Sequence, residues 1–126
     1  MDIKKIVRSG SSRILLEPSF DGMIVTIPDG MFSIRGTEYQ LKQSFTDTVI
    51  QSDSKQDILF YLVKRKDDGS VSVFADVVLP AKKPTNMKDN PDYEMLHKLI
   101  ILAVPAGATN LDVATAIVFQ SDGVAT

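Results

Sequence analysis

Residues 57–80 constrain the fold more than any other stretch, because they form two apolar runs on either side of a charged tip that ends in Asp68-Gly69. Runs rich in Ile, Leu, Phe, Tyr and Val that flank such a turn signal are typical of a β-hairpin. The first run is apolar at every position from residue 58 to residue 63. A strand of this kind must be covered on both faces or lie in the middle of a sheet. We therefore expect the core of the protein to form around this strand.

The length of the loop at the tip of this hairpin follows from the residue pairs that each choice produces. A two-residue loop sets Lys64 against Val73, whereas a three-residue loop at residues 67–69 sets Val63 against Val73. Matching apolar to apolar residues favours the longer loop. We predict the three-residue loop, with Gly69 in the left-handed conformation that such a loop requires.

Residues 31–42 are expected to form a second hairpin, whose register follows from its turn. A two-residue loop at Gly36-Thr37 puts glycine at the first loop position, as a type II′ turn requires. The pairs that this loop produces are chemically matched: Arg35 with Glu38, Ile34 with Tyr39, Ser33 with Gln40, and Phe32 with Leu41. The alternation then predicts a buried face of Phe32, Ile34, Tyr39 and Leu41 and a wet face that includes Ser33 and Gln40.

The rest of the chain also reads as short strands between turns. Residues 81–92 hold two prolines and several charges, so we expect an excursion over the surface there. Residues 93–97 suit either a helical turn or the start of the strand expected at 98–104. Residues 109–120 read as a strand with an irregularity around residues 112–116. Further strands are expected at 13–17, 23–27 and 45–51.

These segments together predict an all-β fold: an antiparallel two-sheet β-sandwich or small barrel of about eight to ten short strands with at most one short helix. The chain has 126 residues, which suffices for one domain with its own core but not for two. We expect an N-terminal arm and joint at residues 1–12 and a single sandwich domain at residues 13–126. The apolar runs at 14–16 and 99–104 are too short for a signal peptide or a membrane span, so neither is expected.

No group of residues in the sequence indicates a catalytic or metal site. The sequence has no Cys, which removes thiolate nucleophiles and zinc sites that need sulfur. His97 is the one histidine, and an ordinary position at a strand end or in a loop explains it better than catalysis does. The run at residues 67–69 is what a hairpin tip needs, and it lacks the ligand spacing of an EF-hand. We therefore expect a non-enzymatic protein with no cofactor, no metal and no small-molecule substrate.

Two basic segments are candidates for partner contacts. The first is the N-terminal arm, a strand too short to fold alone, which either adds to a neighbour's sheet edge or packs on its own domain. The second lies within residues 81–92. Neither segment has aromatic residues between its charges, and the formal net charge is −2, so nucleic acid is not an expected partner. The candidate contact residues are Ile3, Lys4, Ile6, Val7, Lys82, Lys83, Met87 and Tyr93.

Four short motifs occur in an order that resembles a known family. They are IPDG at 27–30, GTEY at 36–39, DILFYL at 57–62 and LAVPAGAT at 102–109, and with the Asp-Gly hairpin they span most of residues 23–119. This order is similar to that of the small β-sandwich virion structural proteins of tailed bacteriophages, especially tail-fibre shoulder or attachment domains and upper-baseplate domains. The resemblance implies an assembly, attachment or decoration module of a fibre, collar, baseplate or capsid surface.

The resemblance also implies partners and a location. The partners would be other virion proteins and further copies of the same chain, with a trimer favoured, and no membrane would be involved. The protein would be made in the host cytoplasm and incorporated into the virion. Members of the family often continue after the last strand with Asp-x-Arg and a long receptor-binding region, whereas this sequence has AIVFQ at 116–120 and stops at Thr126, which speaks against receptor recognition.

A β-sandwich that binds carbohydrate or a cell surface is the alternative function. Such a module would use polar-tipped aromatic rings to stack on sugars. The sequence offers Tyr39, Tyr61 and Tyr93 for this purpose but has no Trp.

Overall fold

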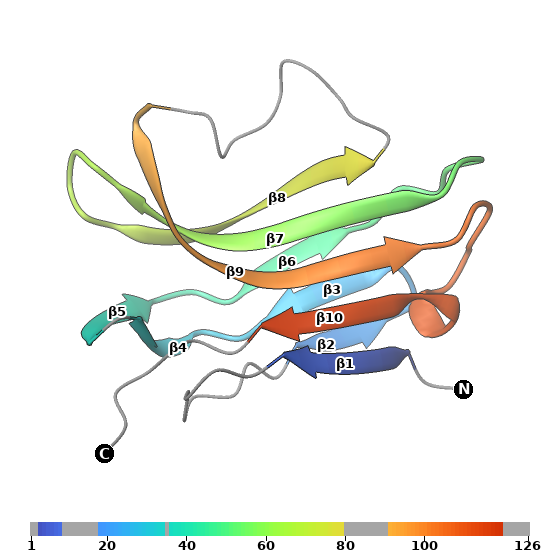
Figure 1. Ribbon diagram of the computed structural model, residues 1–126, viewed down its shortest axis with the longest axis horizontal. Helices are drawn as coiled ribbons and strands as arrows, with labels where there is room; N and C mark the ends of the chain where they lie inside the picture. The colour runs from blue at the N-terminus through green and yellow to red at the C-terminus, as the bar shows by residue number, and fades with distance from the viewer. Residues whose placement is uncertain (1–2, 9–17, 35, 80–90, 120–126) are drawn as a thin grey trace.

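The computed structural model describes residues 3–8, 18–34, 36–79 and 91–119. Within these residues the chain forms ten β-strands and one 3-10 turn (Figure 1). Their bounds are β1 (Lys4–Arg8), β2 (Ser19–Asp21), β3 (Ile24–Ile27), β4 (Gly30–Ile34), β5 (Thr37–Leu41), β6 (Phe45–Thr48), β7 (Gln56–Arg65), β8 (Val71–Leu79), β9 (Tyr93–Val104), η2 (Leu111–Val113) and β10 (Thr115–Phe119). In this part of the chain there is no helix with the length and apolar character that a membrane span needs.

The strands pack as a sandwich of two layers. One layer is a five-stranded sheet in the order β1-β10-β9-β7-β8, and the other holds the sheet β2-β3-β6 and the hairpin β4-β5 (Figure 1). Buried side chains from both layers form one apolar cluster, which includes Val25 and Leu41 from the smaller sheets and Phe60 and Leu102 from the larger one. The predicted all-β sandwich is confirmed. Among the described strands, β1 and β10 form the one parallel pair.

Strand β7 lies inside the five-stranded sheet, with a neighbouring strand on each side, as its sequence predicted. It pairs with β9 on one side and with β8 on the other. Its side chains alternate between two apolar clusters. Ile58, Phe60 and Leu62 face the main core, and Leu59, Tyr61 and Val63 face a second cluster. From Ile58 to Val63 no residue is more than 7% exposed. The expectation that this strand is covered on both faces is confirmed.

The loop at the tip of the β7–β8 hairpin is one residue longer than predicted. The Arg65 N–H donates to the carbonyl of Ser70 at 2.8 Å, which leaves residues 66–69 as a four-residue loop. Lys64 therefore pairs with Val71, and the predicted three-residue loop is wrong. The longer loop still matches apolar residues, since it sets Leu62 against Val73 and Tyr61 against Phe74. Gly69 has a φ of 73°, so the predicted left-handed conformation is confirmed.

The register of the β4–β5 hairpin also differs from the prediction. Phe32 pairs with Tyr39, and Ile34 pairs with Thr37, so the loop consists of residues 35–36. Gly36 takes the second loop position with a φ of 80°, which other two-residue turns require, in place of the first. A shift by two residues keeps the same side chains on each face. Phe32, Ile34 and Leu41 are buried and Tyr39 is half-buried, but Ser33 is buried at 4% exposure and not wet.

The last two strands follow the prediction with one correction. β9 is extended over its whole length from Tyr93 to Val104, so the helical alternative for its first residues is wrong. Its pairing with β7 reaches from Gln56 to Arg65 and holds these residues in the sheet. The expected irregularity before β10 is the 3-10 turn η2, capped where the side chain of Asn110 accepts a hydrogen bond from the Asp112 N–H at 2.8 Å.

The N-terminal strand packs on its own domain. β1 pairs with β10, and the Lys4 N–H donates to the carbonyl of Ala114 at 3.3 Å. Of the two alternatives for this arm, addition to a neighbour's sheet and packing on its own, the structure shows the second. The strand expected at 13–17 and most of the excursion expected at 81–92 lie outside the described residues.

Candidate functional site

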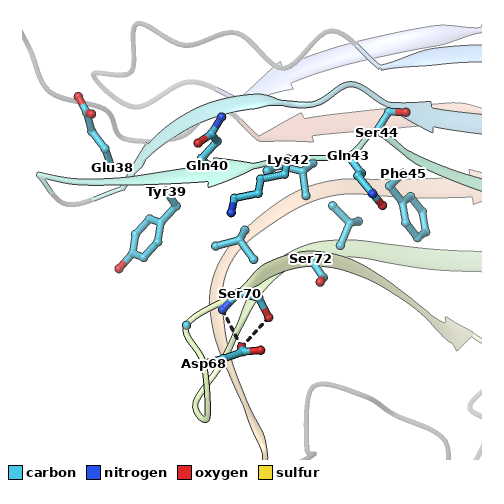
Figure 2. A pocket seen from close by; sticks show the side chains of 14 residues that line it. Glu38, Tyr39, Gln40, Lys42, Gln43, Ser44, Phe45, Asp68, Ser70 and Ser72 are labelled. Carbon is cyan, nitrogen blue, oxygen red and sulfur yellow. Dashed lines mark hydrogen bonds between the residues drawn. The ribbon is translucent and has the colours of Figure 1, made fainter.

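A groove lies between the two hairpins at one end of the sandwich. It encloses about 760 Å³ and is lined by residues 38–45 of β5 and the following loop, and by residues 68–73 at the tip of the β7–β8 hairpin (Figure 2). Ligand sites in proteins commonly have volumes of about 300–1,000 Å³. The groove is therefore large enough to take part in binding.

The β5 side of the groove presents aromatic and polar side chains. Figure 2 shows Tyr39 and Phe45 pointing toward the β7–β8 hairpin, whereas Glu38 and Gln40 point away from it. For Glu38, Tyr39 and Gln40 this division follows from β5, in which successive side chains lie on opposite faces, whereas Phe45 belongs to β6. Tyr39 and Phe45 are half-buried, and Lys42 is exposed. The ring of Phe45 also packs edge-on against Phe60 of the core, with the ring centroids 6.1 Å apart.

The opposite side of the groove is organised by Asp68. Its Oδ1 accepts hydrogen bonds from the Ser70 N–H at 2.9 Å and from the Ser70 hydroxyl at 2.7 Å (Figure 2). The backbone hydrogen bond from Ser70 is the largest cause that lowers the pKa of the Asp68 carboxyl, and the hydroxyl adds to it. Asp68 therefore carries its negative charge at neutral pH.

The floor of the groove is apolar and belongs to the core. Leu41 and Val73 are buried at 4% and 5% exposure, and Val71 on the β7–β8 side is half-buried. A surface of this kind can pack against an apolar group, while the surrounding hydroxyl, amide and charged groups can form hydrogen bonds. The groove is therefore suited to binding a partner through packing and hydrogen bonds.

The chemistry available in the groove is limited to these polar groups. His97 lies on β9 opposite Leu62 and does not line the groove. The Ser70 hydroxyl donates its hydrogen bond to a carboxylate and has no imidazole beside it among the lining residues. No group of three His, Asp or Glu side chains placed to hold a metal ion occurs within the described residues.

The predicted contact residues that the structure describes lie in two places, and neither is the groove. Among the β1 side chains that the structure describes, Lys4 and Ile6 are exposed, and just before β1 Ile3 packs against the main core. Tyr93 is half-buried at the start of β9, where its ring lies 4.8 Å from that of Phe74. The side chain of Val7, and all of Lys82, Lys83 and Met87, lie outside the described residues.

Sequence reasoning missed most of the groove because its two walls are far apart in the chain. It named Tyr39 as a ring that could stack on a sugar, and it placed both hairpin tips. Nothing in either hairpin indicates that their ends meet across the two layers. The polar residues 42–44, which follow an alternating strand, were the one local signal.

The fold and the groove define a class, which is a small two-layer β-sandwich with a surface suited to binding. No protein-family model matches the sequence, and no curated protein matches it.

The crystal structure of the gene 22 product of the Bacillus subtilis phage SPP1 is a solved structure with this fold. The TM-score is 0.62 at 11% sequence identity, and the match covers 95% of this chain and 93% of that one. The chain therefore has the same fold as a bacteriophage protein.

Proposed function

We propose that this chain is a non-enzymatic structural protein of a bacteriophage virion. In this role it acts as an assembly, attachment or decoration module of a fibre, collar, baseplate or capsid surface. The observation that carries the proposal is the fold shared with the phage SPP1 protein, because the match covers nearly all of both chains.

The surfaces of the sandwich support a role in assembly. Both edge strands of the five-stranded sheet, β1 and β8, pair with a described strand on one side only. The outer edge of a sheet offers backbone groups to which a strand of another protein can add. The proposed partners are other virion proteins and further copies of this chain, with a trimer favoured by the family resemblance.

The composition of purified virions tests this proposal. Particles from the host that carries the coding sequence are purified on a density gradient, washed at high salt and analysed by quantitative mass spectrometry. We expect the chain at a fixed copy number per particle, and antibodies raised against it should label the same part of every particle. A chain that is abundant in the lysate but absent from washed particles would contradict the proposal.

Carbohydrate binding is the second candidate function, and the position of Tyr39 supports it. Tyr61 is fully buried and the Tyr93 ring packs on Phe74, whereas the half-buried Tyr39 ring points into the groove (Figure 2). A glycan array tests this function. Saturable binding that is lost in Tyr39→Ala but kept in Tyr93→Ala would support it, and an array without binding would exclude the glycans presented.

A further inference from the structure

The two edge strands of the five-stranded sheet carry backbone groups that no described strand pairs with. On β1, the Lys4 N–H donates to a carbonyl on the β10 side of the strand. Alternate residues of a paired strand point to the same neighbour. The N–H and C=O groups of Lys5 and Val7 therefore point outward, away from β10.

Strand β8 presents outward groups in the same way. The Arg65 N–H donates to the Ser70 carbonyl at 2.8 Å, so the ladder begins with a hydrogen-bonded pair. Hydrogen-bonded and non-hydrogen-bonded pairs alternate along an antiparallel ladder, so the backbone groups of Val73, Ala75 and Val77 point away from β7. The nine residues of β8 include no Lys, Arg or Pro, the residues that often protect an edge from pairing. This edge is therefore well suited to accept a further strand.

The directions and faces of the two edges are those that one continuous sheet needs. β1 runs parallel to β10, and the pairs β10–β9, β9–β7 and β7–β8 are antiparallel, so β1 and β8 run in opposite directions (Figure 1). When β1 of one copy lies beside β8 of a second copy in the same orientation, the new pair is antiparallel. Ile3 and the outward residues of β8 all pack on the main core, so both cores lie on the same side of the joined sheet.

One register of this pair covers an exposed apolar side chain. When Ile6 of one copy lies opposite Phe74 of the other, the outward backbone groups of the two strands also face each other. Ile6 is 39% exposed, although it is large and apolar, and Phe74 is half-buried. A shift of two residues keeps the backbone groups facing but puts Ile6 opposite Ser72 or Asp76. The apolar match therefore favours the register with Ile6 opposite Phe74.

The same register pairs opposite charges. β1 carries three positive charges and no negative one, and Asp76 is the one charged residue of β8. With Ile6 opposite Phe74, Lys4 lies opposite Asp76. The Tyr61 hydroxyl donates to Asp76 Oδ2 and holds this carboxylate on the outer face of the sheet, the face on which Lys4 also lies. Opposite charges in facing positions stabilise paired strands.

Pairing of β1 with a second β1 has the opposite property. An antiparallel pair centred on Lys5 sets Lys5 against Lys5 of the other copy, and a pair centred on Ile6 sets Lys4 against Arg8. Like charges in facing positions destabilise paired strands. The charge of β1 therefore favours β8 of a second copy over a second β1.

We propose that copies of this chain associate head-to-tail, with β1 of each copy added to the outer edge of β8 of the next. Main-chain hydrogen bonds join the two five-stranded sheets, and the apolar pair and the charge pair fix the register. An interface between two different edges continues until a ring closes. This inference rests on the proposed function and deepens its homo-oligomer part, because a ring of three copies is the trimer that the resemblance favours.

Disulfide cross-linking tests which edges meet. The chain has no Cys, so an introduced pair has no competitor. Ile6 and Phe74 would form a non-hydrogen-bonded pair, in which the Cα atoms lie about 4.5 Å apart, a distance that a disulfide spans. Chains with Ile6→Cys and chains with Phe74→Cys are mixed in equal amounts and oxidised. We expect the mixed disulfide in large excess over either homodimer, identified by mass spectrometry of the linked peptides.

The matched control replaces Phe74→Cys by Ile50→Cys. Ile50 is 79% exposed and lies outside both edge strands, so its mixture with Ile6→Cys should give only background cross-linking. A mixed disulfide of Ile6→Cys and Phe74→Cys no more abundant than this background would overturn the inference. Homodimers of Phe74→Cys as abundant as the mixed disulfide would also overturn it, because they would show that two β8 edges pair with each other.

Variants of β1 test the backbone and charge contacts without cysteine. Sedimentation velocity of the purified chain over a wide concentration range should show species larger than the monomer. Lys5→Pro removes an outward N–H and leaves the β10 ladder intact, so it should weaken association about tenfold, whereas Lys5→Ala keeps the N–H and should associate far better. Lys4→Glu, which sets a like charge opposite Asp76, should also weaken association.

A wild-type chain that stays monomeric at every concentration would overturn the inference, as would equal association of Lys5→Pro and Lys5→Ala with wild-type circular dichroism spectra. All of these measurements use the purified chain. Their failure therefore leaves the virion test of the proposed function standing, and absence of the chain from washed virions leaves the cross-linking result standing.

Discussion

At the scale of single residues, a buried polar contact joins Tyr61 of β7 to Asp76 of β8. The Tyr61 hydroxyl donates to Asp76 Oδ2 at 2.7 Å, and the two residues are 0% and 3% exposed. The loss of a buried hydrogen bond lowers the stability of the folded state. This contact therefore stabilises the outer face of β7 and β8 and fixes the direction of the Tyr61 ring, which also packs edge-on against Phe74.

Replacing Tyr61 by phenylalanine tests this contact. Tyr61→Phe keeps the ring but removes the donor, so the free energy of unfolding should fall by about 1–3 kcal/mol in a urea titration. Tyr39→Phe is the matched control, because the Tyr39 ring is half-buried in the groove and its loss of a hydroxyl should change stability by less than about 0.5 kcal/mol. Equal stability of Tyr61→Phe and the wild type would show that the hydrogen bond contributes nothing.

Asp68 gives a prediction for pH. Its pKa in the folded chain lies below the ordinary value of 3.8, chiefly because the Ser70 N–H bonds its carboxylate. The carboxylate's contribution to stability is therefore present above pH 3.8 and is lost as the pH falls through the lower folded value. NMR titration of the Asp68 carboxyl should give a pKa that rises part of the way back in Ser70→Ala, which loses the hydroxyl but keeps the N–H. Ser72→Ala should leave it unchanged, and an equal pKa in all three chains would contradict this explanation.

At the scale of elements, β1 depends on backbone hydrogen bonds to β10. Lys4 pairs with Thr115, and its N–H donates to the Ala114 carbonyl, so the N–H of Ile6 also points toward β10 and that of Lys5 points outward. Proline removes the N–H at whichever position it occupies.

Two proline variants separate these directions. Ile6→Pro should lower the free energy of unfolding by roughly 1–3 kcal/mol, because it breaks the ladder with β10. Lys5→Pro should have a much smaller effect, since proline is tolerated where the N–H of an edge strand faces solvent. Urea titration of both variants measures the difference, and a larger loss in Lys5→Pro would contradict the observed register.

Some features of the strands and hairpins could be predicted from the sequence, and others could not. The strand β7 is buried on both faces, and its unbroken apolar run was enough to predict this burial. The sequence predicted where the two hairpins lie but not their registers. The side chain of Asp68 accepts hydrogen bonds within a longer loop at one tip, and Gly36 takes the second turn position at the other. In each case one residue decides between turn types that the flanking strands tolerate equally.

The candidate site could not be predicted for a different reason. The groove forms where β5, in one layer, meets the tip of β8, in the other. A strand's own sequence specifies which face is buried, but it does not specify which distant hairpin will lie beside its edge. The predicted contacts on β1 followed from local charge and hydrophobicity, and these residues do lie at an edge of the sheet.

At the scale of the whole molecule, the sandwich has a buried apolar centre and sheet edges that pair with a described strand on one side only. One apolar cluster joins the two layers, and a second covers the outer face of β7. Among the described residues, the groove and the outer edges of β1 and β8 present backbone or polar groups that a partner could bind. This arrangement suits a building block that is held in an assembly by several neighbours at once.

A cryo-electron microscopy reconstruction of the purified virion tests the central proposal most directly. The account predicts repeated copies of this sandwich in the density, each with a neighbouring protein against the edge of β1 or β8. A reconstruction whose density is fully explained by other proteins, with no copy of this sandwich, would contradict it.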